Sequence, residues 1–153
     1  MPMHPIFLKM FLDNGNWGKT QYLLEKGMDV AVTRRNVIAD NIANADTPHF
    51  KRSEVSFEAE LKRVLDSEKA VAANAVPAKT THERHIPFFR SRDFREVDGR
   101  THIDYLSTMR NDGNNVDPEH EVNMAVKTQM QYQAMATQIN GNFRMLNIVL
   151  RTV

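Results

Sequence analysis

The chain has 153 residues, of which 41% are hydrophobic and 25% are charged, and its 20 basic and 19 acidic side chains give a net charge of +1. These values predict one folded unit over residues 1–153. They exclude a low-complexity tail and a bulk electrostatic attraction to nucleic acid or to an anionic membrane. Since the chain has no cysteine, disulfides, thiolate nucleophiles and cysteine zinc sites are excluded as well.

The beginning of the chain carries no recognisable targeting signal. Residues 6–12 form a short apolar run that Lys9 interrupts, with no basic segment before it and no small-residue cleavage pattern after it. No apolar run in the sequence approaches the ~18 residues of a membrane span. We therefore expect neither a cleaved signal peptide nor a membrane span. A protein of this kind would leave the cytoplasm by a route that does not cleave it.

A helix is predicted over about residues 20–43. Its apolar residues alternate by four and three positions, the pattern of a helix that packs one stripe against a neighbour. The stripe consists of Leu24, Met28, Ala31, Ile38 and Ile42. Arg35 interrupts it where an apolar residue is expected. The pair Thr47–Pro48 excludes a longer helix, because proline pushes the preceding residue toward an extended backbone.

Residues 44–116 have the weakest pattern in the chain. A short helix is predicted over residues 57–65, where the apolar residues fall on one side. Residues 69–79 are alanine-rich and contain Pro77, which indicates a linker or a weak helix followed by a loop. Residues 110–115 form a turn cluster. The middle of the chain is therefore expected to be loop-rich and partly extended.

A second long helix is predicted over residues 117–153. Asp117 is a good N-cap, Pro118 suits the first helical position, and Glu119 and Glu121 suit the positive end of the helix dipole. The spacing of four and three continues to the last residue through Ala125, Gln129, Tyr132, Ala136, Ile139, Phe143, Leu146, Leu150 and Val153. Val122, Val126 and Met130 widen the apolar face at its start. A stripe this long, beside an underfilled middle, indicates a surface for a partner.

The sequence contains near-misses to chemical motifs but no complete one. Residues 15–20 resemble a phosphate-binding loop, yet Asp13 stands where the motif needs glycine. His82 would need a histidine four residues later to form a zinc-protease pair, and Ile86 is there. The basic pairs at residues 34–35 and 51–52 are better explained by a solvated helix face or by ion pairs than by nucleic acid. We predict no enzyme, no catalytic residue, no cofactor and no metal.

The end of the first helix carries the most specific pattern. Asn44, Asp46 and Thr47 can hydrogen-bond the exposed backbone groups of a helix end, and Pro48 forces an exit from it. The run from Asn41 through Pro48 to Lys51 also resembles the signature near the N-terminus of bacterial flagellar rod, hook and hook-associated proteins. That signature usually has glycine after Thr-Pro. His49 stands there instead, which argues against a left-handed backbone at this position.

Three further stretches, at residues 84–87, 112–117 and 131–133, resemble the proximal-rod type within this family. The resemblance implies a structural subunit that polymerises helically, connects the membrane ring to the distal rod and transmits motor torque. It implies export through the flagellar type III apparatus without cleavage, and a basal-body location in the periplasm. The implied partners are copies of the chain, other rod proteins, and a membrane-ring or export-gate adaptor at the rod base.

The resemblance also implies a mainly α fold, in which the two long terminal helices pair as an antiparallel coiled coil and are poorly ordered before assembly. The residues predicted to carry assembly are Leu24, Met28, Ile38, Ile42, Tyr132, Ile139, Phe143, Leu146 and Leu150. The alternative is a soluble coiled-coil adaptor or export chaperone. Such a protein would fold as a stable dimer with a sharp, concentration-dependent thermal transition.

Overall fold

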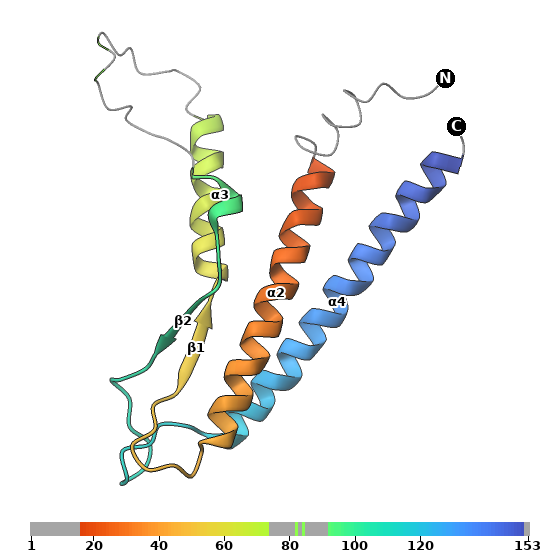
Figure 1. Ribbon diagram of the computed structural model, residues 1–153. Helices are drawn as coiled ribbons and strands as arrows, with labels where there is room; N and C mark the ends of the chain where they lie inside the picture. The colour runs from red at the N-terminus through yellow and green to blue at the C-terminus, as the bar shows by residue number, and fades with distance from the viewer. Residues whose placement is uncertain (1–15, 74–81, 83, 85–91, 152–153) are drawn as a thin grey trace. The chain divides into compact units, whose positions relative to one another are not determined.

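The computed structural model describes residues 16–73, 82, 84 and 92–151. These residues form a mainly helical structure with one small sheet, which confirms the predicted fold class (Figure 1). The elements in chain order are α2 (Asn16–Ala43), β1 (Ser53–Ser56), α3 (Glu58–Ala73), the 3₁₀ turn η1 (Phe94–Glu96), β2 (Arg100–Ile103) and α4 (Pro118–Arg151). None of the described helices is long and apolar enough to cross a membrane.

The chain folds as two compact units, one from the described residues up to 55 together with those from 103 onward, and one from Ser56 to His102. The first unit contains both long helices. The second contains α3 and η1. β1 pairs with β2 in a two-stranded sheet, and these two strands carry the chain out of the first unit and back into it.

Helix α2 begins at Asn16, earlier than the predicted start at residue 20, and ends at Ala43 as predicted. Its first turn gains a contact that the local pattern did not reveal. The rings of Trp17 and Phe143 meet edge to face with their centroids 6.4 Å apart, a favourable arrangement for an aromatic pair. This contact with a distant part of the chain helps to stabilise the additional helical turn.

Helix α4 begins at Pro118, as its sequence predicts, and is described to Arg151. The carboxylate of Asp117 accepts a hydrogen bond of 3.0 Å from the backbone N–H of Glu119. This bond satisfies one of the donors that the first turn of a helix leaves without an internal partner. The predicted N-cap is therefore confirmed, while Val153 at the end of the predicted stripe lies outside the described residues.

Helices α2 and α4 run antiparallel. Trp17, near the start of α2, contacts Phe143, and Gly27 approaches Met135 so closely that a Cβ on the glycine would lie 2.8 Å from the sulfur. At the end of α2, the amide of Asn41 donates to Glu121 over 3.1 Å. Because the partner's residue number falls as that in α2 rises, the predicted antiparallel pairing is confirmed.

The face that α4 turns inward differs from the predicted stripe at alternate positions. Tyr132, Ile139 and Leu146 are at least partly buried as predicted. Thr128 is also buried, and Met135 and Asn142 are half-buried, whereas Gln129, Phe143 and Leu150 are exposed. A helix whose apolar residues are spaced by four and three can turn the residues on either side of that stripe toward the neighbouring helix. Gly27 has no side chain, and it therefore leaves room for the side chain of Met135 on one side of the stripe.

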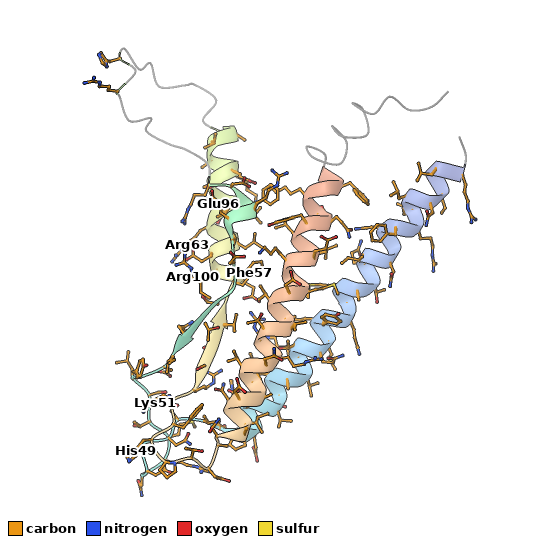
Figure 2. The ribbon with its side chains drawn as sticks, in the orientation of Figure 1. His49, Lys51, Phe57, Arg63, Glu96 and Arg100 are labelled. Carbon is orange, nitrogen blue, oxygen red and sulfur yellow. The ribbon has the colours of Figure 1, made fainter. Side chains whose placement is uncertain are left out.

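In the second unit, α3 extends to Ala73, beyond the short helix predicted over residues 57–65. Residues 66–73 are mostly alanine, glutamate and lysine, which favour helix, and no proline occurs between Pro48 and Pro77. Among the described residues of this unit, the buried apolar ones are Phe57, Val64 and Val97. Figure 2 labels Phe57 together with the charged side chains of Arg63, Glu96 and Arg100 in the same unit.

Candidate assembly site

The residues that follow α2 form the hydrogen-bonded helix stop that the sequence predicts. The side-chain amide of Asn44 donates to the carbonyl of Asp40 over 2.8 Å, and the hydroxyl of Thr47 donates to the side-chain oxygen of Asn44 over 3.3 Å. Asp46 behaves differently, because its exposed carboxylate pairs with Arg110 at 3.0 Å rather than with the helix end. Pro48 is exposed at the exit from the turn.

Asn114, which lies far along the chain, holds this turn from the other side. Its side-chain amide is completely buried and lies 3.1, 3.0 and 2.8 Å from the backbone carbonyls of Asn44, Ala45 and Thr47. Its side-chain oxygen accepts from the N–H of Val116 over 2.7 Å. One asparagine thus satisfies carbonyl groups that the end of a helix leaves without internal donors.

His49 adopts a left-handed backbone with φ of 61°, contrary to the expectation from its replacing the usual glycine. A left-handed residue other than glycine costs about 1–2 kcal/mol. The backbone N–H of His49 offsets part of this cost by donating to the carbonyl of Asp112 over 3.1 Å. The next turn accommodates the imidazole, because Gly113 (φ 80°) has no Cβ and one there would lie 3.0 Å from Nδ1 of His49. Figure 2 shows His49 in this loop.

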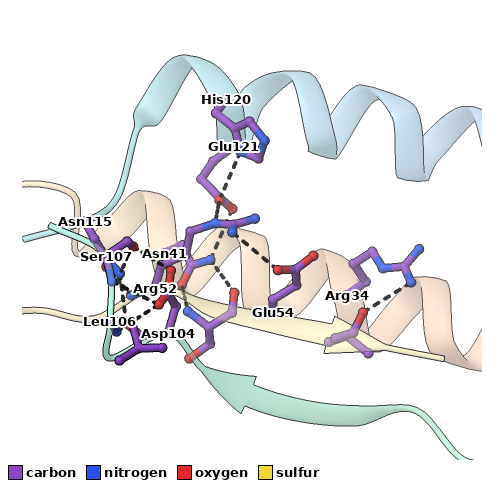
Figure 3. Close-up of polar contacts among 12 residues, drawn as sticks. Arg34, Asn41, Arg52, Glu54, Asp104, Leu106, Ser107, Asn115, His120 and Glu121 are labelled. Carbon is purple, nitrogen blue, oxygen red and sulfur yellow. Dashed lines mark hydrogen bonds and ion pairs between the residues drawn. The ribbon is translucent and has the colours of Figure 1, made fainter. Parts of the chain in front are cut away.

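A buried polar cluster joins the end of α2 and the start of β1 to the first turn of α4 (Figure 3). Asn41, which is 1% exposed, donates to the carboxylate of Glu121 over 3.1 Å and to the carbonyl of Ser53 over 2.8 Å, and it accepts from the N–H of Ser53 over 3.0 Å. Nε of Arg52 donates to the other carboxylate oxygen of Glu121. Both oxygens of this carboxylate therefore have partners inside the fold.

Glu121 is the residue of this site whose role the sequence did not reveal. The sequence indicated only that an acid here suits the positive end of the helix dipole, whereas the side chain is 1% exposed and lies inside the fold. A buried carboxylate is tolerated only where a cation and hydrogen-bond donors compensate it. Arg52 supplies the cation, so this member of the basic pair at 51–52 forms an internal ion pair.

The segment after β2 is held by its own polar groups and by Asn115. The carboxylate of Asp104 accepts from the backbone N–H groups of Leu106 and Ser107 over 3.0 and 3.2 Å, and from the hydroxyl of Ser107 over 2.5 Å. These bonds, that of the Ser107 hydroxyl first, lower the pKa of Asp104, and the charge of Arg52 acts in the same direction. The amide of Asn115 donates to the carbonyl of Asp104 over 2.9 Å.

The predicted assembly residues of α2 fall into two groups. Ile38 is buried against the rest of the first unit, and Leu24 and Met28 are half-buried. Ile42 is 37% exposed. Arg35, which interrupts the stripe, is exposed beside a small hollow that Tyr132 also lines.

On α4, Tyr132, Ile139 and Leu146 are half-buried, whereas Phe143 and Leu150 are 44% and 51% exposed. The burial of these side chains within one chain does not test their role in assembly. Their part in assembly stays a prediction.

The residues that the structure describes contain no group of three or more histidine, aspartate or glutamate side chains that could hold a metal ion. In the stretch 82–86, which partly matches a zinc-protease motif, His82 and Arg84 are exposed. His85 and Ile86 lie outside the described residues.

Comparison with known proteins agrees with the resemblance at the end of α2. A family model described as "Flagella basal body rod protein" matches residues 24–51. The chain is 40% identical to the flagellar basal body rod protein FlgB of Borreliella burgdorferi over 124 residues, covering 81% of this chain and 90% of that relative. The FlgB of Bacillus subtilis is 33% identical over 129 residues, 83% of this chain and 89% of the relative, and that of Escherichia coli K12 is 27% identical over 126 residues, 82% and 88%. The chain belongs to the FlgB family of flagellar basal body rod proteins.

Proposed function

We propose that this chain is a structural subunit of the proximal rod, which polymerises helically to connect the membrane ring to the distal rod and to transmit torque. The observation that carries this proposal is the similarity to FlgB rod proteins over more than four fifths of the chain. The family is structural, in agreement with the prediction that the chain is not an enzyme. The soluble adaptor alternative lacks such support, because the matched relatives are rod proteins.

The exposed surface of the first unit supports a role in polymerisation. Large apolar side chains of α4 lie 49–69% exposed, on parts of the helix that α2 leaves uncovered: Val122, Val126, Met130, Met145, Ile148 and Leu150. Burying one such side chain contributes about 1.5–3 kcal/mol. Neighbouring subunits that cover these positions would therefore stabilise the helix pair and the polymer together.

The buried cluster around Glu121 suits a part that carries mechanical load. It ties α2, β1 and α4 together through Asn41, Arg52 and Glu121, and no buried polar side-chain atom of the described residues lacks a hydrogen-bond partner. A fully satisfied polar cluster accepts only one geometry, so it resists sliding between the two helices. We infer that it fixes the angle and register with which each subunit enters the polymer.

The family places the chain in the flagellar basal body rod, with other rod subunits as partners. The finer assignments belong to the proposal: contact with a membrane-ring or export-gate adaptor at the rod base, a periplasmic position, and export without cleavage of a signal peptide. Deletion of the gene followed by electron cryotomography of basal bodies tests the central claim. Membrane rings without a rod, restored by a complementing copy, are expected. Intact rods in a strain without a second gene copy would reject the proposal.

The substitution Leu146→Asp tests the helix surface. Leu146 is half-buried on α4, so a carboxylate there opposes its burial against any apolar surface, including that of a neighbour. We expect the variant to be exported but not incorporated into rods, so that cells are non-motile. Lys127→Asp, at an exposed position of the same helix, serves as the control and should be incorporated. Normal rods with Leu146→Asp would remove this surface from the proposal.

A further inference from the structure

The second half of α4 contains the dipeptide Asn140–Gly141, and both of its residues are exposed. Beyond its own helix turn, a Cβ built on Gly141 would meet none of the described residues within 4 Å. Gly141 therefore differs from Gly27, whose lack of a side chain makes room for Met135. The packing of the described chain gives no reason for a glycine at position 141, and the dipeptide is open to water.

An asparagine that precedes a glycine can lose its side-chain amide without an enzyme. The backbone nitrogen of Gly141 attacks the side-chain carbonyl carbon of Asn140, so that a C–N bond forms, the bond to the amide nitrogen breaks and ammonia leaves with the proton of the backbone nitrogen. Water then opens the cyclic imide at either carbonyl and yields aspartate or iso-aspartate at position 140. Glycine favours the attack because it has no Cβ beside the attacking nitrogen, and asparagine is a thermally labile residue.

The helix holds this reaction back. In an α-helix the N–H of each residue donates to the carbonyl four residues earlier, so helical geometry engages the backbone nitrogen of Gly141 and fixes the backbone of Asn140. The nitrogen and the side-chain carbon can therefore meet only when this turn opens. Glycine is among the weakest helix formers, which makes opening easier at Gly141 than at most other positions of α4.

The contacts next to this turn hold it less firmly than the buried cluster holds the start of α4. Asn142 donates to Gln21 over 3.4 Å, longer than the usual range of about 2.7–3.2 Å. Phe143 meets the ring of Trp17 edge to face but stays 44% exposed. Segments with few buried contacts open locally at a lower cost than the core does. The turn at Gly141 is thus a favourable place for local opening.

We propose that Asn140–Gly141 is a spontaneous deamidation site whose rate is set by the opening of this turn of α4. The amide is retained while the turn is helical, and each opening exposes it to attack. Iso-aspartate adds a methylene group to the backbone and interrupts the helical ladder of hydrogen bonds, so a modified chain should lose contacts that Asn142 and Phe143 make with α2. The reaction needs no partner, and the inference is therefore independent of the rod function proposed above.

Peptide mapping of the full-length chain tests the site. The purified chain would be incubated at mildly alkaline pH in buffer and in guanidinium chloride, sampled over time and cleaved with trypsin. Cleavage after Lys127 and Arg144 releases residues 128–144, in which mass spectrometry locates the exchange of amide for acid at Asn140. The pair Asn14–Gly15 lies outside the described residues and falls in another peptide. We expect conversion at Asn140 to be about 10-fold faster, or more, in denaturant than in buffer.

Two asparagines of the same helix serve as internal controls. Asn142 and Asn147 are followed by Phe143 and Ile148, whose side chains hinder attack by the backbone nitrogen, so both should keep their amides. Gly141→Ala adds the same kind of hindrance at the proposed site and favours the helix. It should slow conversion at position 140 both in denaturant and in buffer.

A variant away from the dipeptide tests control by helix opening. Trp17→Ala removes the ring contact with Phe143 and leaves Asn140 and Gly141 unchanged. It should speed conversion in buffer about 2- to 10-fold, the effect of losing one aromatic pair, and should not change the rate in denaturant. Tyr105→Ala removes an aromatic ring that is 71% exposed, and as the matched control it should change neither rate.

The contrary outcomes separate the two parts of the proposal. Retention of the amide at Asn140 in denaturant would overturn the site itself, as would equally fast conversion at Asn142 or Asn147. Equal rates in buffer and in denaturant would overturn control by the helix. An unchanged rate in buffer for Trp17→Ala would also overturn that control.

Discussion

The two ends of the α2–α4 pair are held together by different means. At one end, Asn41, Asn114 and Glu121 are each at most 1% exposed and connect segments 70–80 residues apart. At the other end, the contacts include the ring pair of Trp17 with Phe143 and a hydrogen bond of 3.4 Å between Gln21 and Asn142.

Beyond this second end, Met145, Ile148 and Leu150 are more than half exposed. The comparison indicates a division of labour. We propose that the polar end fixes the register of the helix pair within one chain and that the apolar end supplies surface for neighbouring subunits. A polar cluster specifies geometry because every group must be satisfied, whereas apolar contacts tolerate a change of partner.

Removing the buried carboxylate should have the largest effect on the polar end. Glu121→Ala removes the buried acceptor that the guanidinium of Arg52 and the amide of Asn41 share. Breaking a buried pair in this way costs about 3–5 kcal/mol. We expect the free energy of unfolding, measured by urea denaturation followed by circular dichroism, to fall by that amount. Glu119→Ala removes an exposed acid from the same turn and should change it by less than about 0.5 kcal/mol. Equal effects of the two substitutions would contradict the assignment.

Asn114→Ala should have the next largest effect. It removes the donor to the carbonyls that follow α2, and a buried group that loses its partner costs about 1–3 kcal/mol. Hydrogen exchange should show the loss concentrated at the end of α2 and at residues 44–50. Asn111→Ala, at an exposed position of the same turn cluster, is the matched control and should leave exchange unchanged. Uniform loss of protection over the whole of α2 would argue against a local role.

The sequence predicted those parts of the fold that depend on local signals. The end of α2 at Ala43 and the start of α4 at Pro118 follow from the asparagine, aspartate and proline residues beside them. The extent of α3 to Ala73 was missed because alanine-rich residues without an apolar stripe give a weak pattern. The contact between Met135 and Gly27 could not be predicted from the pattern of either helix alone, because it depends on how the two helices pack together.

The polar site was predictable in part. Asn44 and Thr47 bond at the helix end as expected, because their partners are three or four residues away. The roles of Asn114 and Glu121 depend on partners 70 and 80 residues away, which no local pattern identifies. The left-handed backbone of His49 was missed for the same reason, because a bond to the carbonyl of Asp112 overrides the local preference for glycine.

Two glycine substitutions should have effects of opposite sign. Gly113→Ala places a Cβ 3.0 Å from Nδ1 of His49 on a backbone with φ of 80°, so we expect a loss of stability of about 1–2 kcal/mol. Gly141→Ala adds a methyl group to α4 where nothing lies within 4 Å, and should raise stability by about 0.5–1 kcal/mol. Thermal unfolding of both variants checks the pair. The same sign for both would contradict the described geometry of the turn.

The smallest effect concerns acid pH and the loop that follows β2. The hydroxyl of Ser107, followed by the N–H groups of Ser107 and Leu106, lowers the pKa of Asp104 from its ordinary value of 3.8. A carboxyl group whose pKa is lower in the folded state contributes stability above its ordinary value, and the contribution is lost as the pH falls through the folded value. The wild type should therefore exceed Asp104→Asn in stability at neutral pH, and the difference should shrink as the pH falls below 3.8. Ser107→Ala removes the leading cause, so a carboxyl titration by nuclear magnetic resonance should show the pKa of Asp104 rising toward its ordinary value. An unchanged pKa in that variant would mean that the hydroxyl of Ser107 does not hold the carboxylate of Asp104 in this loop.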